Sequence, residues 1–219
     1  MLEGITVGSK SLREHFEVAN HRDAILYVEE IVGHEEALSE WQIKNLHSLV
    51  LKGIAADEAG RYRRENVAIS GASTTPPGLL HLADDMRALL DWHRQAAAAH
   101  PVARAAELHA RFVKIHPFID GNGRTGRLLQ NFELMKAGYP PAVIRKEDRL
   151  AYYDALDIAC VSGVYDDITE LVAEAVARSL GVYLDLLAPA MRADPDDASS
   201  SPPPTEESPP RPSRALPLP

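Results

Sequence analysis

A twelve-residue stretch from His116 to Arg127 concentrates residue types that phosphate chemistry needs: a histidine, a carboxylate, three glycines and two arginines. The glycines interrupt regular structure, and the apolar residues that follow have helical spacing, so the stretch predicts a turn running into a helix from Arg127. Glycines just before a helix let backbone N–H groups approach an anion, and the helix dipole adds positive potential there. The stretch therefore predicts an anion pocket with a histidine at its lip.

The polar side chains of this stretch each suit a task in phosphate transfer. Asp120 offers a hard oxygen ligand for Mg²⁺ between phosphates. Arg124 and Arg127 are three residues apart, so both are expected on one side of the first helical turns, where a guanidinium fork matches phosphate oxygens. Asn122 can donate its side-chain amide to a non-bridging oxygen, and His116 titrates near neutrality, so it can accept a proton from an attacking hydroxyl. Together they indicate phosphoryl or nucleotidyl transfer.

The stretch resembles the signature of the Fic (filamentation induced by cyclic AMP) family, His-x-Phe-x-Asp/Glu-Gly-Asn-Gly-Arg-x-x-Arg, with every fixed position filled. The similarity extends from about residue 5 to about residue 180. The resemblance implies AMPylation, in which AMP moves from ATP to a Ser, Thr or Tyr hydroxyl of a target protein and pyrophosphate leaves. It also implies an all-α, Fic-type helical bundle with a short β-hairpin flap.

The resemblance implies a role for each matching residue. His116 would be the base and Asp120 the Mg²⁺ ligand, and Arg124 would bind the outer phosphates with support from Arg127. Relatives that act as kinases have a lysine at the position of Gly123 and bind the nucleotide the other way round, so glycine favours AMP transfer. The nucleotide-binding set comprises Gly121, Asn122, Gly123, Arg124, Gly126, Arg127, Tyr152 and Tyr153, with the first three around the α-phosphate.

The same glycines also satisfy the dinucleotide-binding pattern Gly-x-Gly-x-x-Gly. In that alternative, residues 112–115 and 142–144 would be strands around a helix over 127–137, with Glu147 or Asp148 at the ribose. The preceding residues 105–111 are helix formers, and no alternation of strands and helices follows, so the alternative is disfavoured.

Composition restricts the class of protein. The chain has 219 residues with 45% hydrophobic and 25% charged residues, as expected for one soluble globular domain. The formal net charge of −9 argues against a nucleic-acid partner. The single Cys160, expected in the core, excludes an internal disulfide and favours a reducing, cytoplasmic location. No signal peptide and no apolar run of about eighteen residues is found, so no membrane association is expected.

Hydrophobic periodicity and capping residues predict a bundle of about seven helices. Ser11 and Ser39 are the expected N-caps of the first two, and Pro101 is expected near the start of the helix that delivers His116. Two histidines inside helices, His47 and His109, are expected to be buried structural residues. The helices are expected at residues 12–32, 40–53, 79–97, 102–115, 127–137, from 149, and 167–187.

Residues 60–71 change character and predict an extended arm or hairpin that ends at Pro76-Pro77. Their position resembles the Fic flap, which pairs with the target's backbone by strand addition. An ordinary surface loop is the alternative, and Arg61 and Arg63 either order the arm or face nucleotide and target. The residues expected to dock the target are Asn66, Val67, Ala68, Ile69 and Ser70.

Later segments carry weaker signals. Tyr152 and Tyr153 match a Tyr-Tyr-x-Ala-Leu pattern that lies near the adenine in the family, although a helical tyrosine pair is also typical of a core. Residues 162–167 depart from the family's usual Gly-Asp and proline. We expect a catalytic domain over 1–190 and a disordered tail rich in Pro, Ser and acidic residues over 191–219.

Many Fic enzymes carry an inhibitory Ser/Thr-x-x-x-Glu-Gly/Asn helix whose glutamate pairs with the second signature arginine, here Arg127. This chain lacks that pattern, so either the chain is shortened at its start or a separate partner supplies the glutamate. Two alternatives to AMP transfer stay open: a non-catalytic nucleotide-binding regulatory module, and transfer of UMP or another phosphate-linked group. The target, the nucleotide base and the oligomeric state are not predicted.

Overall fold

The computed structural model describes residues 11–34 and 37–192, and its backbone there is helical without any strand. The expected all-α fold is confirmed. The segment 60–78 runs through turns, bends and irregular backbone, so the expected β-hairpin is not formed among the described residues. Of the expected tail, residues 191–192 are the end of the last helix, and residues 193–219 lie outside the described residues. The helices are α1 Leu12–Gly33, α2 Glu40–Val50, η1 Leu79–His81, α3 Leu82–Gln95, η2 Ala96–Ala98, α4 Pro101–Ile115, α5 Asn122–Lys136, α6 Arg149–Ser162 and α7 Asp166–Arg192.

Side-chain capping sets where the early helices begin, as predicted. Ser11 and Glu14 form a capping box at the start of α1, and Ser39 and Gln42 form another at α2. Pro101 occupies the first turn of α4, where its missing N–H costs no hydrogen bond. Helix α2 ends at Val50, three residues before the glycine expected to stop it.

Helix α5 begins at Asn122, five residues before the predicted start. The Asn122 side chain accepts from the Phe118 N–H at 2.9 Å and donates to the Phe118 carbonyl at 2.8 Å, which closes the preceding loop. Gly121, the N-cap, has φ of +80°, a conformation that favours glycine. The second half of the signature, residues 122–127, therefore lies inside the helix.

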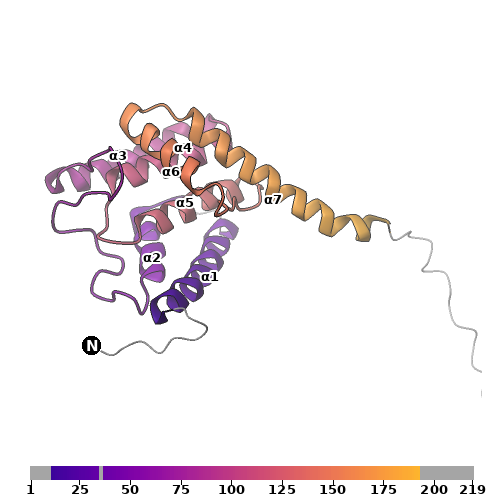
Figure 1. The fold of residues 1–219 in the computed structure, drawn as a ribbon, viewed down its shortest axis with the longest axis horizontal. Helices are drawn as coiled ribbons and strands as arrows, with labels where there is room; N and C mark the ends of the chain where they lie inside the picture. The colour runs from indigo at the N-terminus through magenta and orange to yellow at the C-terminus, as the bar shows by residue number, and fades with distance from the viewer. Residues whose placement is uncertain (1–10, 35–36, 193–219) are drawn as a thin grey trace, which may run out of the picture. The chain divides into compact units, whose positions relative to one another are not determined.

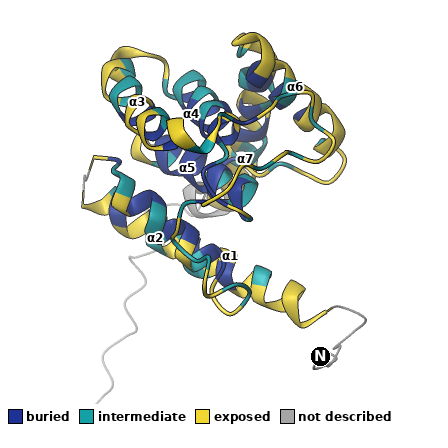
Figure 2. Cartoon of the chain, turned by 90° about the vertical axis from the view of Figure 1, so that its left-hand side faces the viewer, coloured by how far each residue is buried: buried dark blue, intermediate teal, exposed yellow. Residues whose placement is uncertain are grey.

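The dinucleotide-binding alternative is wrong, because its predicted first strand, residues 112–115, is the last turn of α4. Helices α4 and α5 pack against each other at the centre of the bundle (Figure 1). Buried residues gather along these two helices (Figure 2), with Phe112 of α4 and Phe132 of α5 fully buried. The packing of α4 on α5 fixes both ends of residues 116–121, the loop that joins these helices.

The described residues up to Val182 belong to one compact unit that contains the whole signature region, and the described residues from Tyr183 belong to a second unit. The predicted domain boundary at residue 190 stays a prediction. Within the part of the chain that the structure describes, no helix combines the length and apolar character needed to cross a membrane.

Candidate active site

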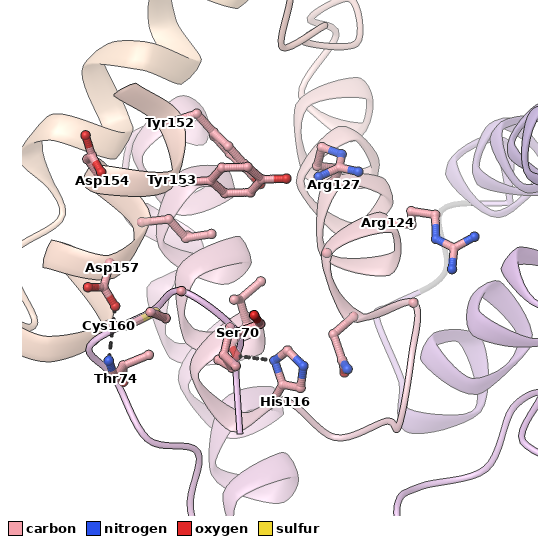
Figure 3. Close-up of a pocket in the computed structure, with 18 of the residues that line it drawn as sticks. Ser70, Thr74, His116, Arg124, Arg127, Tyr152, Tyr153, Asp154, Asp157 and Cys160 are labelled. Atoms are coloured by element: carbon pink, nitrogen blue, oxygen red, sulfur yellow. Dashed lines mark hydrogen bonds between the residues drawn. The ribbon is translucent and has the colours of Figure 1, made fainter. Parts of the chain in front are cut away.

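A cavity of about 600 Å³ lies where the signature faces α6 and the segment 69–74 (Figure 3). His116, Asp120 and Arg124 line it from the signature. The side chains of Val113, Leu156 and Cys160 add apolar surface. One cavity therefore brings together the expected base, the expected metal ligand and the expected phosphate-binding arginine.

His116 terminates α4 in a left-handed conformation, with φ of 51° and ψ of 59°. It is the one non-glycine residue with positive φ among those described, and such strain is typical of functional positions. Its Nδ1 lies 3.2 Å from the Val113 carbonyl, which can only accept, so Nδ1 carries the proton and Nε2 keeps its lone pair. Burial lowers the pKa of His116, and Arg63 lowers it further, so the ring is neutral and able to act as a base.

Arg63 holds this histidine in place from a buried position beneath the segment 64–77. Its Nε donates to the His116 carbonyl at 3.1 Å, and its backbone N–H donates to Pro117 at 2.9 Å. The two terminal nitrogens donate to the carbonyls of Glu65 at 2.9 Å and Pro77 at 2.5 Å. Sequence reasoning left the role of Arg63 open, and the structure shows that it orders the arm.

His47 anchors the next part of the signature. Its Nδ1 accepts from the Gly60 N–H at 3.0 Å, so Nε2 carries the proton and donates to the Asp120 carbonyl at 2.9 Å. The ring stacks on Phe118, with centroids 3.5 Å apart and planes 4° from parallel. Burial lowers its pKa to about 4, which keeps it neutral. A Cβ at Gly121 would meet this ring at 3.3 Å, so glycine also serves close packing there.

The N-terminus of α5 offers two of the three predicted anion-binding amides, those of Asn122 and Gly123, together with the amide of Arg124. The third predicted amide, that of Gly121, already donates to the Asp120 Oδ1 at 2.6 Å. The first helical hydrogen bond runs from Thr125 N–H to the Gly121 carbonyl. Among the described residues, the backbone N–H groups of Asn122, Gly123 and Arg124 have no acceptor, and all three residues line the cavity. Orphan amides at a helix N-terminus are suited to bind phosphate.

Two residues of the predicted nucleotide-binding set make structural contacts. The Asn122 side chain is buried and bonded to Phe118, so its amide is not free for a phosphate oxygen, although its backbone N–H is. Gly126 does not line the cavity. A Cβ there would lie 2.9 Å from the His109 ring, so Gly126 is needed for close packing of α4 on α5.

Arg124 and Asp120 belong to a row of charges that extends to α1. Arg124 lies 3.3 Å from Asp120 and 3.2 Å from Glu17, and Arg13 lies 2.6 Å from the Asp120 Oδ2. Burial alone would raise the pKa of Asp120, but the Gly121 N–H and the two arginines outweigh it and hold that pKa below its usual value. Sequence reasoning missed Arg13 and Glu17, because only the fold brings α1 beside the signature.

Arg127 lies apart from Arg124, against the tyrosine pair of α6 (Figure 3). Tyr152 is buried and shares a hydrogen bond of 2.9 Å with His109, whose other nitrogen meets Gln130 at 2.8 Å. Tyr153 is half exposed. The predicted structural role of His109 is confirmed, and the two arginines do not share one direction as expected.

A second cavity, of about 340 Å³, lies on the other side of Arg127. Its wall carries the cationic side chains of Arg145, Lys146 and Arg149 as well as Arg127. Positive charge therefore continues beyond the first cavity, although the whole chain has a formal net charge of −9.

The segment 66–70 alternates in exposure: Val67 and Ile69 are half-buried, whereas their neighbours are exposed. Such alternation is typical of an extended strand with one face on the protein. Among the described residues, Val67, Ala68 and Ser70 make no hydrogen bond. The segment thus presents an unpaired backbone edge, and Ile69 and Ser70 line the same cavity as His116.

The donor set fits a magnesium ion shared with phosphates. Asp120 is an ionised carboxylate at the cavity, and Mg²⁺ is commonly held by one or two carboxylates plus substrate phosphates. No group of three or more His, Cys, Asp or Glu side chains suited to a metal occurs within residues 11–34 and 37–192, so a metal cage made only of protein is not found there.

Known proteins agree with this geometry. Residues 37–134 match the Fic/DOC family. The protein named "Protein adenylyltransferase Fic" of Aedes aegypti is 38% identical over 183 residues, 82% of this chain and 36% of its own length. The protein of the same name from Drosophila willistoni is 37% identical over 182 residues, which make up 82% of this chain and 36% of that protein. The chain spans about a third of the length of these curated relatives.

Solved structures give the same result. Fic-1 from C. elegans superposes with a TM-score of 0.74 at 31% identity, over 85% of this chain and 56% of that one. A Fic domain containing signaling protein from Bacteroides thetaiotaomicron has a TM-score of 0.70 at 29% identity, and the match covers 79% of this chain and 71% of that one. With the complete signature at the N-terminus of α5 and these matches, the chain belongs to the Fic/DOC family.

Proposed function

We propose that this chain transfers AMP from Mg²⁺-ATP to a Ser, Thr or Tyr hydroxyl of a target protein and releases pyrophosphate. One observation carries the proposal: the free Nε2 of His116 and the orphan amides of residues 122–124 line the same cavity. The curated relatives are named protein adenylyltransferases, which supports the same chemistry.

The nucleotide's phosphates would lie along the N-terminus of α5. The orphan amides of Asn122, Gly123 and Arg124 suit the α-phosphate, where negative charge builds up during transfer. The Arg124 side chain suits the outer phosphates, and Arg127 stands between the two cavities, where it can support them. The base would lie on the apolar side of the cavity, near Tyr153.

His116 would act as general base. Its neutral Nε2 takes the proton from the target hydroxyl while that oxygen forms a bond to the α-phosphorus. The bond from the α-phosphorus to the bridging oxygen breaks, and pyrophosphate leaves with the electron pair. Asp120 would hold a Mg²⁺ ion against the phosphates, and such an ion supplies charge neutralisation for the leaving group.

The protein target would dock on the segment 66–70 by strand addition, because Val67, Ala68 and Ser70 leave their backbone groups without a hydrogen-bond partner among the described residues. Main-chain pairing there would bring a hydroxyl side chain toward His116. Regulation by a partner that supplies a glutamate to Arg127 is part of this proposal, since Arg127 makes no ion pair within the described residues. A cytoplasmic location is also proposed, from the single, buried Cys160.

The test is incubation of the chain with ATP labelled at the α-phosphate and a cell lysate, in parallel with the His116→Ala variant. We expect label on protein with the wild-type chain and none with the variant, while both bind ATP to a similar degree. Equal labelling by both would overturn the role of His116. Binding of ATP without any transfer would favour the regulatory-module alternative, and parallel reactions with labelled UTP, GTP and CTP test the base preference.

A further inference from the structure

The far end of the docking segment is fixed by one carboxylate of α6. Asp157 accepts hydrogen bonds from the Ser73 N–H, at 3.0 Å to each of its oxygens. It also accepts one from the Thr74 N–H at 3.1 Å (Figure 3). These residues lie 83 and 84 positions from Asp157 in the chain, so no local turn explains the contact. Charge-assisted hydrogen bonds of this kind are stronger than those between neutral groups.

The near end of the segment is fixed independently. Arg63 donates to the carbonyls of Glu65 and Pro77, and the Asn66 side chain accepts from the Leu79 N–H at 2.8 Å. Between Asn66 and Ser73, the internal hydrogen bond that the structure shows is from Ala72 to Ile69. The stretch is thus attached at both ends, and in between Val67, Ala68 and Ser70 make no hydrogen bond among the described residues.

Attachment at both ends matters for recognition by strand addition. A free arm must lose conformational entropy when a partner strand pairs with it, and a segment already extended loses less. The attachment at Asp157 is three residues beyond Ser70, at the end of the segment that lines the cavity. This attachment therefore sets how often the edge is in the extended position beside His116.

We propose that Asp157 is a positioning residue for protein-target docking: by binding the amides of Ser73 and Thr74 it holds the edge 66–70 extended over the cavity. The inference rests on the proposed function, because it concerns how the protein acceptor reaches the same site. Asp157 touches neither nucleotide nor reacting atoms in this assignment.

The test compares Asp157→Ala and Asp157→Asn with a matched control, Asp154→Asn. The control removes the same charge one turn earlier on α6, from a side chain that makes no hydrogen bond among the described residues. Asparagine keeps one acceptor oxygen, so Asp157→Asn should lie between wild type and Asp157→Ala. Melting temperatures and exchange protection in α6 show that each variant is folded.

Amide hydrogen exchange tests the attachment without any substrate. We expect the Ser73 and Thr74 amides to exchange at least about tenfold faster in Asp157→Ala, because their acceptor is gone. The control should exchange as wild type does. Equal exchange of these amides in wild type and Asp157→Ala would overturn the proposal, whether or not the chain transfers AMP.

Transfer kinetics test the consequence, with the inactive His116→Ala chain supplied as the protein acceptor and with ATP labelled at the α-phosphate. We expect Asp157→Ala to raise KM for this acceptor about tenfold, because the fraction of molecules with the edge in the docking position falls to about a tenth. We expect kcat and the KM for ATP to stay within about twofold of wild type. An unchanged KM for the acceptor, or a loss confined to kcat, would overturn the proposal. Absence of transfer by the wild-type chain would count against the proposed function. The hydrogen-exchange measurement would still test whether Asp157 holds the Ser73 and Thr74 amides.

Discussion

The Nε of Arg63 donates to the carbonyl oxygen of His116 at 3.1 Å, across 53 positions of sequence. His116 is the residue whose backbone adopts the left-handed conformation at the end of α4. A conformation of this kind persists only where its surroundings over-determine it, and Arg63 supplies part of that constraint together with the Nδ1 bond to Val113. The orientation of the proposed base therefore depends on a side chain outside the signature.

Replacing Arg63 by lysine should reduce both activity and stability. One ammonium group cannot reach the three carbonyls that the guanidinium binds, so partly buried acceptors are left unpaired, at a cost of up to about 1–3 kcal/mol each. We expect a lower free energy of unfolding in urea and a fall in kcat of about tenfold or more for AMP transfer. The control is Arg61→Lys, at an exposed position, which should change neither quantity. Equal behaviour of the two variants would contradict the role of Arg63.

The pH dependence of transfer should follow the lowered pKa of His116. Because burial favours the neutral ring, the base form persists below the ordinary value near 6.5. We expect kcat/KM to be flat from pH 8 down through about 6.5 and then to fall tenfold per pH unit below the lowered pKa. The pKa of Asp120 is also lowered, from an already acidic value, so it does not titrate in that range. A midpoint above 6.5 in the free enzyme's profile would show that the ring is not held neutral.

Stability should fall in mild acid because of two buried histidines. Burial lowers the pKa of His47 and of His109 to about 4, whereas both rings bind a proton near pH 6.5 in the unfolded chain. The unfolded state therefore binds more protons between those values, and stability decreases as the pH falls from about 6.5 to about 4, by about 3 kcal/mol for each ring. Urea unfolding at pH 7.5, 6.0 and 5.0 measures the slope. His47→Gln should reduce it, and an unchanged slope would contradict the assignment.

Arg13 should compete with a divalent cation for Asp120. Its guanidinium binds the Asp120 Oδ2, and both side chains are about half exposed, so the contact is worth about 0.5–1 kcal/mol. Arg13→Gln should therefore lower the Mg²⁺ concentration needed for half-maximal binding of a fluorescent ATP analogue by about two- to fivefold. The control on the same helix is Arg22→Gln, whose guanidinium pairs with Asp23. Identical Mg²⁺ titrations for both variants would exclude competition at Asp120.

Two glycines of the signature should respond differently to alanine. At Gly126 a Cβ would lie 2.9 Å from the buried His109 ring, so Gly126→Ala should lower the free energy of unfolding by about 1–3 kcal/mol. At Gly123 the nearest atom is the Arg127 Nη1 at 3.7 Å, an ordinary contact, so Gly123→Ala should leave stability within about 0.5 kcal/mol. Chemical denaturation of both variants measures the difference, and equal losses would refute the packing role of Gly126.

The existence of the helices and the chemistry of the signature could be predicted from the sequence, because both depend on neighbours in the chain. Ser11 and Ser39 cap their helices through residues three positions on, and helical periodicity does not depend on the rest of the fold. The residues that support the signature were decided by the tertiary structure alone. Four polar residues contact the signature or its docking segment from more than fifty positions away in the chain: Arg13, His47, Arg63 and Asp157. A polar residue in a loop or on a helix face carries no local sign of such a distant partner. The same reason explains why the sequence does not predict the structural contacts of Asn122 and Gly126. Their partners are the Phe118 backbone in a closed loop and the His109 ring of the neighbouring helix, which meet them only once the chain has folded.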